Sequence, residues 1–346
     1  MASHRRPKQP SRTRVTVLTT AAAAAVALSS QAANAAPSEK PSKDEVKAKV
    51  DKLYEEAEQA TEKYNGAKEK QEKLQKEIST LQDNVARGQE ELNELRDGLG
   101  SMASAQYRSG GIDPSLQLFL SADPDNYLDK ASTLDQLSGQ QVEALKKIQE
   151  KQRDLAQQRS EASEKLKDLS ATRTELGNKK KEVQGKLSSA QKLLNTLTAQ
   201  EKAALQQEEQ RANRTSERQA LSGKTTPASG RAGAAFAAAQ SKIGTPYVYG
   251  ATGPSSFDCS GLTSWAYAQA GVGIPRTSQA QANYGTRISS MSQLQVGDLV
   301  FFFNDLHHVG LYAGNGQVLH APRTGTNVRY ESMSTIGGPF MFGVRV

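Results

Sequence analysis

Apolar residues between Val46 and Met102 recur at alternating steps of four and three, within a stretch that is otherwise dense in charge. This spacing is that of the a and d positions of a coiled coil, and it continues for eight heptads with interruptions only at Gln71 and Gly88. A second seam repeats every seven residues from Ile148 to Leu197. The pattern predicts two long amphipathic helices.

The segment between the two seams contains Gly110, Gly111 and Pro114, which are residues that end helices. We therefore expect the helices to fold back on each other as an antiparallel coiled-coil hairpin over residues 36–221. The alternative is that each seam pairs with a second chain. Neither helix offers an obvious site for chemistry.

The pattern changes after residues 222–230, which have the composition of a linker. Helices are predicted over residues 232–243, from Cys259 onward and over residues 278–284. Apolar strands follow at 299–303, 309–313 and 317–321, with further strands near 327–330 and 342–346. Helices followed by a run of antiparallel strands predict an α+β domain over residues 231–346.

The first 35 residues have the features of a secretory signal peptide. Five Arg and Lys residues precede an alanine-rich apolar run from Val15 to Leu28, and the cleavage pattern Ala33-Asn34-Ala35 follows it. The run is shorter than the ~20 residues that a membrane-spanning helix needs, so we expect cleavage and secretion rather than anchoring. Arg5-Arg6 suggests twin-arginine export, but the residues after it favour general secretion.

Charge excludes a nucleic-acid partner. The formal net charge of the whole chain is +7, and without the five basic residues of the predicted signal peptide it falls to +2. A nearly neutral mature chain has no basic surface of the kind that binds phosphate backbones. Hydrophobic residues make up 36% of the chain, which is low because the coiled coil has only a narrow apolar seam.

The only cysteine of the chain, Cys259, lies in the sequence FDCSGLTSW. Asp258 is predicted to cap the helix that starts here, and exposed amides at a helix N-terminus favour a thiolate. A thiolate is the nucleophile of covalent catalysis. The alternative is a buried cysteine that acts as a small apolar residue, but the polar neighbours Asp258 and Ser260 argue against it.

A turn at Asn315-Gly316 predicts a hairpin that brings His308 and His320 together. One histidine then serves as the base for Cys259 while the other orients its ring. His307 competes with His308, because alternation alone does not say which of them faces the cysteine. Cys259 with the three histidines forms a conceivable zinc site, but the usual ligand spacings are absent, so no cofactor or metal is expected.

With these residues assembled, the last 116 residues resemble the NlpC-type (NlpC/p60) family of secreted cell-wall cysteine peptidases. The resemblance rests on GTPYVYG, FDCSGL, IPRTSQAQ, VGDLVFF, HVGLYAGNG and VLHAP in this order. It implies a papain-like fold with Cys259 as nucleophile, His308 as base and His320 as the third member. It also implies a substrate site that includes Tyr247, Asp258, Ser260 and Arg276. Ala251 departs from the family pattern, in which many members have glycine.

The resemblance implies a peptidoglycan D,L-endopeptidase that cleaves the bond between D-isoglutamate and a diamino acid of the stem peptide. The alternatives are an N-acetylmuramoyl-L-alanine amidase or a non-catalytic peptidoglycan-binding or activator protein. In similar proteins a coiled coil docks on a membrane-embedded division or elongation complex, or blocks the active site. Residues 103–133, with Leu116, Leu118, Phe119 and Leu120, are predicted as the docking tip.

Overall fold

The computed structural model describes residues 41–108, 116, 127–221 and 230–346. The predicted signal peptide, the breaker segment with Pro114, most of the linker and Leu118, Phe119 and Leu120 lie outside the described residues. Ser42–Val346 form one compact unit. Within the described residues, no helix combines the length and apolar character needed to cross a bilayer.

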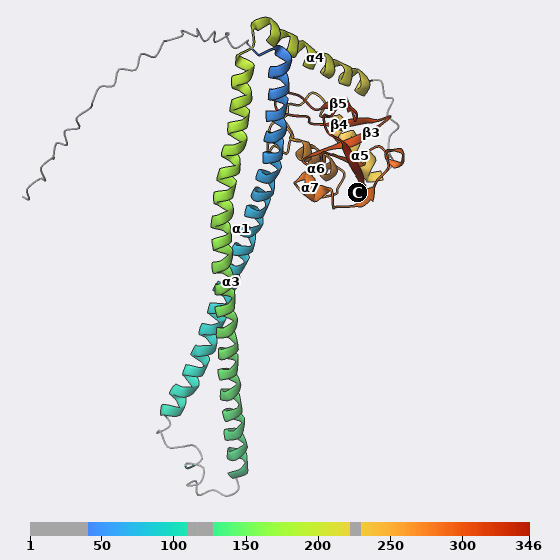
Figure 1. The fold of residues 1–346 in the computed structure, drawn as a ribbon. Helices are drawn as coiled ribbons and strands as arrows, with labels where there is room; N and C mark the ends of the chain where they lie inside the picture. The colour runs from blue at the N-terminus through green and yellow to red at the C-terminus, as the bar shows by residue number, and fades with distance from the viewer. Residues whose placement is uncertain (1–40, 109–115, 117–126, 222–229) are drawn as a thin grey trace, which may run out of the picture. The chain divides into compact units, whose positions relative to one another are not determined.

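The two predicted helices are α1 (Lys43–Arg108) and α3 (Tyr127–Asn195), which lie side by side (Figure 1). Three clusters of buried side chains join them: Val46 and Val50 with Ala190 and Leu197, Leu74 and Ile78 with Leu169, and Leu92 with Ile148 and Leu155. The start of α1 therefore meets the end of α3. The predicted antiparallel coiled-coil hairpin is confirmed.

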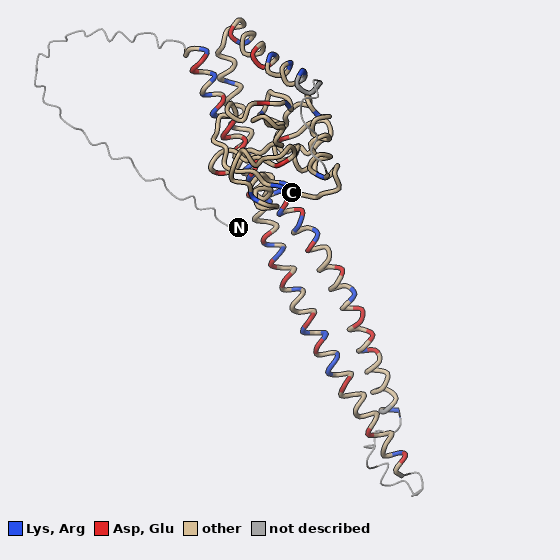
Figure 2. Tube along the Cα trace, turned by 90° about the vertical axis from the view of Figure 1, so that its right-hand side faces the viewer, with Lys and Arg blue, Asp and Glu red and all other residues tan. Residues whose placement is uncertain are grey.

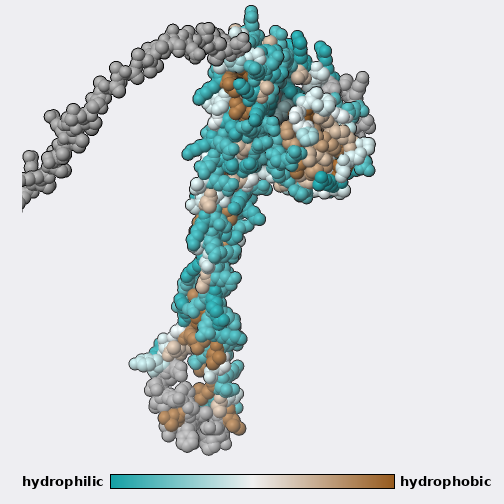
Figure 3. Space-filling view, in the orientation of Figure 1, coloured by the Kyte–Doolittle hydropathy of each residue, from teal (hydrophilic) through white to brown (hydrophobic). Residues whose placement is uncertain are grey.

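Residues of both charge signs are interspersed along α1 and α3 (Figure 2), and the visible surface of the two helices is mostly hydrophilic (Figure 3). Some of these residues pair across the two helices, as in Lys165 Nζ with Glu77 Oε2 at 2.7 Å and Lys186 Nζ with Glu56 Oε2 at 2.7 Å. Gly88, which interrupts the predicted seam, faces Leu155. A Cβ atom at position 88 would lie only 2.8 Å from Leu155 Cδ2, so the glycine makes room for the leucine.

The helical region does not continue as one arm to residue 221, as the sequence had suggested. It breaks after Asn195, and α4 (Ala199–Leu221) begins with a capping box in which Thr198 and Glu201 bond to each other's backbone amides. The new helix packs on the edge strand β5 (Arg329–Ser332) of the C-terminal sheet. Ser216 Oγ accepts a hydrogen bond from the amide of Tyr330 at 2.6 Å and so occupies an edge amide.

The C-terminal domain has helices α5 (Gly230–Gln240), α6 (Cys259–Gln269) and α7 (Ser278–Gln281), then a six-stranded sheet. Its strands are β1 (Thr286–Ile288), β2 (Leu299–Phe302), β3 (His308–Gly314), β4 (Gln317–His320), β5 and β6 (Phe340–Arg345). The order β1-β6-β2-β3-β4-β5 is antiparallel throughout. The predicted α+β class is confirmed, although β1 was not predicted.

The β3–β4 hairpin turns at Asn315 and Gly316, whose φ angles of 52° and 68° suit a tight turn of the predicted kind. β3 contacts α6 on one face of the sheet, where Leu262, Val309 and Leu311 are fully buried. This packing brings the start of α6 close to the first residue of β3.

Candidate active site

Cys259 is the first residue of α6, as the sequence predicted. Asp258 has an extended backbone, and its side chain accepts a hydrogen bond from the amide of Gly261 at 2.6 Å, which is the geometry of an N-cap. The thiol therefore lies at the positive end of a helix, where backbone amides are available to an anion.

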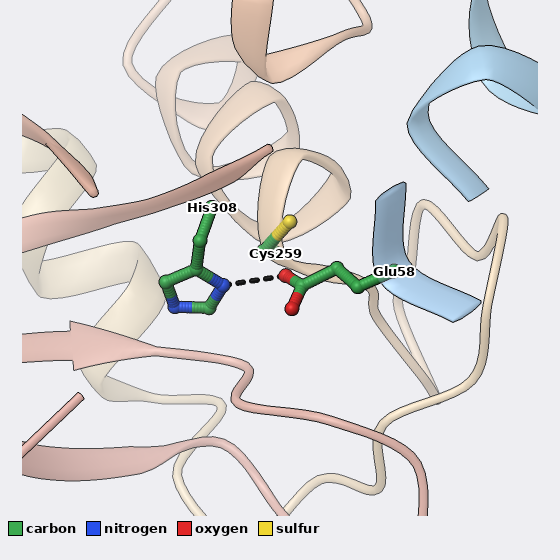
Figure 4. Close-up of side chains that lie close together, drawn as sticks. All are labelled: Glu58, Cys259 and His308. Atoms are coloured by element: carbon green, nitrogen blue, oxygen red, sulfur yellow. Dashed lines mark hydrogen bonds and ion pairs between the residues drawn. The ribbon is translucent and has the colours of Figure 1, made fainter. Parts of the chain in front are cut away.

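His308 and His320 meet at the ends of β3 and β4 that lie far from the turn. His308 Nε2 is 2.7 Å from His320 Nδ1, and the two rings are nearly perpendicular, at 86°. The Nδ1 side of His308 faces Cys259 (Figure 4), and the side chains of Cys259 and His308 offer ligand atoms within 4.8 Å of each other. Such an arrangement can supply a nucleophile, a base and a residue that orients the base.

His307 does not take part in this arrangement. Its Nδ1 bonds to Asp305, and its ring stacks on Phe303 with the ring centroids 4.1 Å apart. Only its backbone approaches the nucleophile, with the carbonyl oxygen 3.6 Å from Cys259 Sγ. The choice between the two adjacent histidines therefore falls on His308.

Helix α1 contributes residues that the sequence did not single out. Glu58, Glu62 and Asn65 lie on one face of α1 because they are spaced by four and three residues. Glu58 Oε1 is 2.5 Å from His308 Nδ1 (Figure 4). The sequence offered no obvious site for chemistry on the coiled coil, but this part of α1 lies directly against Cys259 and His308.

Glu62 lies beside the nucleophile. Its carboxylate accepts hydrogen bonds from Ser260 Oγ and from the amide of Ser278, both at 2.6 Å, and lies 3.9 Å from Cys259 Sγ. The side chain is only 2% exposed, and Cys259 is only 1% exposed. A substrate carbonyl has no path to the thiol while α1 stays in this position.

Asp258 and Arg276, two predicted substrate-site residues, are also engaged. Asn65 Nδ2 donates to Asp258 Oδ2 at 3.0 Å, and Arg276 donates to Asp258 Oδ2 at 2.5 Å and to Ser260 Oγ at 2.7 Å. Gly250 adds a backbone donor to Asp258 at 2.9 Å. The structure thus brings Asp258, Ser260 and Arg276 into one polar cluster, with α1 lying against it.

Residues 244–341 match the model of the NlpC/P60 family. The C-terminal domain belongs to the NlpC/P60 family. A protein of Corynebacterium glutamicum named probable endopeptidase is 49% identical over 126 residues, which are 36% of this chain and 58% of that protein. The probable endopeptidase p60 of Listeria innocua is 45% identical over 113 residues, which are 32% of this chain and 24% of that protein.

Among solved structures, the NlpC/p60 domain of the peptidoglycan hydrolase SagA is 39% identical. The similarity covers 33% of this chain and 98% of that one, with a TM-score of 0.31. The chain spans less than two thirds of the length of the curated relatives described above. The similarity to the relatives described here is therefore a similarity of the NlpC/P60 domain.

Burial and three nearby carboxylates both act against a thiolate at Cys259. Burial raises the pKa of Cys259 well above its ordinary value, and the carboxylates of Glu58, Glu62 and Asp258 raise it further. The prediction of a lowered thiol pKa was wrong for this arrangement of the chain. The helix N-terminus does favour the thiolate, but a buried site with three carboxylates disfavours it more.

Two neighbouring groups are shifted as well. Burial lowers the pKa of His308, but the carboxylate of Glu58 outweighs it and leaves the pKa raised. Burial and the charge of Asp258 raise the pKa of Glu62 to about 7. In this arrangement both the thiol of Cys259 and the ring of His308 therefore hold a proton more tightly than in water.

Tyr247, the remaining predicted site residue, is buried near Glu58 and Cys259. Burial, and after it the charges of these two residues, raise the pKa of the Tyr247 hydroxyl.

Glu58, Cys259 and His308 are the only group of three His, Cys, Asp or Glu side chains within the described residues that could hold a metal ion. The direct bond between Glu58 and His308 accounts for their approach without an ion. A cavity of about 630 Å³ lies beside Glu58, His308 and His320.

Sequence reasoning missed Glu58, Glu62 and Asn65 because charged and amide side chains are common throughout the coiled coil. One signal was available. Residues 57–67, with the sequence AEQATEKYNGA, contain the small residues Ala57, Ala60, Gly66 and Ala67 close together. Small residues on more than one face of a helix indicate that two neighbours pack closely against it.

Proposed function

We propose that this chain is a secreted cysteine endopeptidase of peptidoglycan that hydrolyses the bond between D-isoglutamate and the diamino acid of the stem peptide. The observation that carries the proposal is the approach of Cys259, at the N-terminus of α6, to the His308–His320 pair. The family match and the endopeptidase names of similar proteins support it.

The geometry suits acyl transfer once α1 has moved away. His308 Nδ1 takes the proton of Cys259, and the thiolate attacks the carbonyl carbon of the substrate. The amides at the start of α6, including that of Cys259, stabilise the oxyanion. The amine leaves with the proton from His308, and a thioester remains. Water, deprotonated by His308, then hydrolyses the thioester and restores the thiol.

The polar cluster beside the thiol suits an acidic peptide. Arg276, Ser260 and the amide of Ser278 surround the carboxylate of Glu62, directly or through Ser260. A carboxylate of the stem peptide can take the same donors when Glu62 has left. We assign Tyr247, Asp258, Ser260 and Arg276 to substrate binding, as the family resemblance implies.

The coiled coil regulates the enzyme in this proposal. Glu58 occupies the nitrogen of His308 that has to accept the thiol proton, so the closed form is inactive. A partner at the far end of the hairpin, such as a membrane-embedded division or elongation complex, is proposed to release α1. The described part of that end exposes Tyr107, Leu116, Leu128 and Val142.

The test is digestion of purified muropeptides with the mature chain, residues 36–346, and with its Glu58→Ala/Glu62→Ala variant. Products separated by mass are expected to show disaccharide-dipeptides, and Cys259→Ala is expected to lower the rate by roughly 10³-fold or more. Release of intact stem peptides would instead identify an amidase. Binding to peptidoglycan without any product in either variant would support the non-catalytic alternative and contradict the proposal.

A further inference from the structure

A further polar side chain lies beside His320, on the side away from His308. The Nε2 atom of His320 is buried without a hydrogen bond among the described residues and lies 3.4 Å from Glu331 Oε2, on the neighbouring strand β5. His308, His320 and Glu331 therefore follow one another across three adjacent strands, β3, β4 and β5. The first two members were predicted from the sequence, whereas Glu331 was not.

The chemistry places a demand on His320. When His308 holds the proton of Cys259, both of its ring nitrogens carry hydrogen, and its Nε2–H has to donate to His320 Nδ1. His320 can accept there only if its ring is neutral and its own proton is on Nε2. Burial and the adjacent His308 lower the pKa of His320 to about 4 although Glu331 raises it, and a pKa of about 4 favours a neutral ring.

Glu331 supplies the group that selects this tautomer. Its carboxylate is held by Arg329, which donates from Nε at 3.1 Å and from Nη2 at 2.9 Å. Burial alone would raise the pKa of Glu331, but His320 and Arg329 outweigh it and lower the pKa to about 2. An ionised carboxylate can only accept hydrogen bonds, so it favours a proton on the facing nitrogen of His320.

A purely structural role for Glu331 has to be separated from this one. Arg329 also donates to Glu209 of α4 at 2.5 Å, so it joins α4 to the sheet. Loss of either carboxylate removes one partner of Arg329 and weakens the same ion-pair network. Only Glu331 approaches His320, and this difference provides a matched control.

We propose that Glu331 is a positioning residue that fixes the proton of His320 on Nε2, so that Nδ1 stays free to accept from His308. The consequence for catalysis rests on the proposed cysteine peptidase function. The proton position itself does not, and it is measurable in the mature chain whether or not the chain cleaves peptidoglycan.

The first experiment is nuclear magnetic resonance of the mature chain labelled with ¹⁵N in its histidine rings. The mature chain has three histidines, and His320→Gln and His307→Gln assign the signals. We expect a neutral His320 with its hydrogen on Nε2. A protonated ring, or hydrogen on Nδ1, in the unsubstituted chain overturns the proposal without recourse to any Glu331 variant.

The same spectra of Glu331→Gln and Glu209→Gln provide the comparison. We expect the fixed tautomer to be lost in Glu331→Gln and kept in Glu209→Gln, although both variants remove a carboxylate from Arg329. If Glu331→Gln does not fold, Glu331→Asp keeps the charge and should preserve the tautomer. An unchanged tautomer in folded Glu331→Gln means that Glu331 serves stability alone.

The second experiment measures reactivity in the Glu58→Ala/Glu62→Ala background, where His308 is released. Glu331→Gln is expected to slow alkylation of Cys259 by iodoacetamide roughly tenfold at neutral pH. It should also lower kcat for muropeptides roughly 10–100-fold, which is about the loss seen when the hydrogen-bond partner behind a metal-ligating histidine is removed. KM should change little. The upper pH limit of kcat/KM should move to lower pH, because Glu331 raises the pKa of His308, whose proton the leaving amine takes. If Glu331→Gln slows alkylation but neither protein cleaves muropeptides, the proposed function is refuted and the inference about Glu331 stands. If Glu331→Gln changes neither alkylation nor kcat, the inference is refuted.

Discussion

The two halves of α1 have the same heptad seam but bury different residues outside it. Beyond residue 68, the charged side chains of α1 are exposed or partly exposed, and only the seam is buried. Between residues 57 and 67, the polar residues Glu58, Thr61, Glu62 and Asn65 are buried against the NlpC/P60 domain as well. Burying a carboxylate is costly unless it keeps its hydrogen-bond and charge partners. The contact between the first half of α1 and the NlpC/P60 domain is therefore stable only while the partners of Glu58 and Glu62 remain in place.

The largest effect expected is the opening of this contact. Glu58→Ala/Glu62→Ala leaves the amide of Ser278, Ser260 Oγ and His308 without their partners from α1 and removes two carboxylates near Cys259. Both changes favour a reactive thiol, so alkylation of Cys259 in the mature chain should rise roughly a hundredfold, equivalent to about 2.7 kcal/mol.

The matched control for this variant is Glu90→Ala/Glu94→Ala, which has the same spacing on the second half of α1, where both side chains are exposed. Its alkylation rate should equal that of the unsubstituted chain. Equal acceleration in both variants would mean that the thiol responds to coiled-coil stability in general, and the contrast between the halves would be lost.

The seam, the helix start at Cys259 and the β3–β4 hairpin could be predicted because each depends on local rules. Heptad spacing, an N-cap and a two-residue turn are all readable within a few residues of the sequence. The resemblance to the NlpC/P60 family then chose His308 over His307, a choice that strand alternation alone left open.

The family resemblance had suggested that a coiled coil can block the active site, but the residues that cover it could not be predicted. They make contacts between positions nearly 200 apart in the sequence, such as Asn65 and Asp258. A glutamate on a charged helix looks the same whether it faces water or an active site. The break before α4 was missed for a related reason. The capping box at Thr198 is a local signal, but the second seam runs as far as Leu197 and the charge-dense sequence after it looks like more of the same helix.

The second expected effect is a pH dependence of the closed contact. Glu62 has its pKa raised to about 7 from the ordinary value of 4.5, so the closed form binds a proton more tightly than the open form. The pKa of His308 is also raised in the closed form. Stability from both groups is complete at low pH and is lost as the pH rises, for Glu62 between about 4.5 and 7.

The equilibrium constant for opening of α1 should therefore increase at least tenfold from pH 5 to pH 8. A tenfold change requires the pKa of Glu62 to differ by only about 1 between the closed and open forms. The measurement is hydrogen exchange of the amides of residues 58–66, corrected for intrinsic exchange at each pH. Charges facing Glu62 and His308 come from Glu58, Asp258, Arg276 and Glu331, so Glu62→Gln should reduce the dependence without removing it. A profile that Glu62→Gln leaves unaltered would exclude Glu62 as a source.

The third effect concerns α4, which touches the sheet edge and not the thiol. Ser216→Ala removes the acceptor of the Tyr330 amide and leaves a buried donor unpaired, which should cost about 1–2 kcal/mol in thermal or urea unfolding. Ser334→Ala, at an exposed serine after the same strand, serves as the control and should cost little. If both substitutions cost the same, α4 contributes nothing specific at this amide.

The smallest effect tests the second half of the coiled coil. Ile148 is buried with Leu92 and Leu155, and Ile148→Val deletes one methylene-sized group from that cluster. We expect a loss of about 1 kcal/mol in unfolding free energy, because the remaining side chains fill the space only partly. Alkylation of Cys259 should stay unchanged, since the contacts of Glu58 and Glu62 lie many turns away along α1. If this small loss exposed the thiol, the two halves would open as one unit, and release of the active site could be driven from the far end of the hairpin.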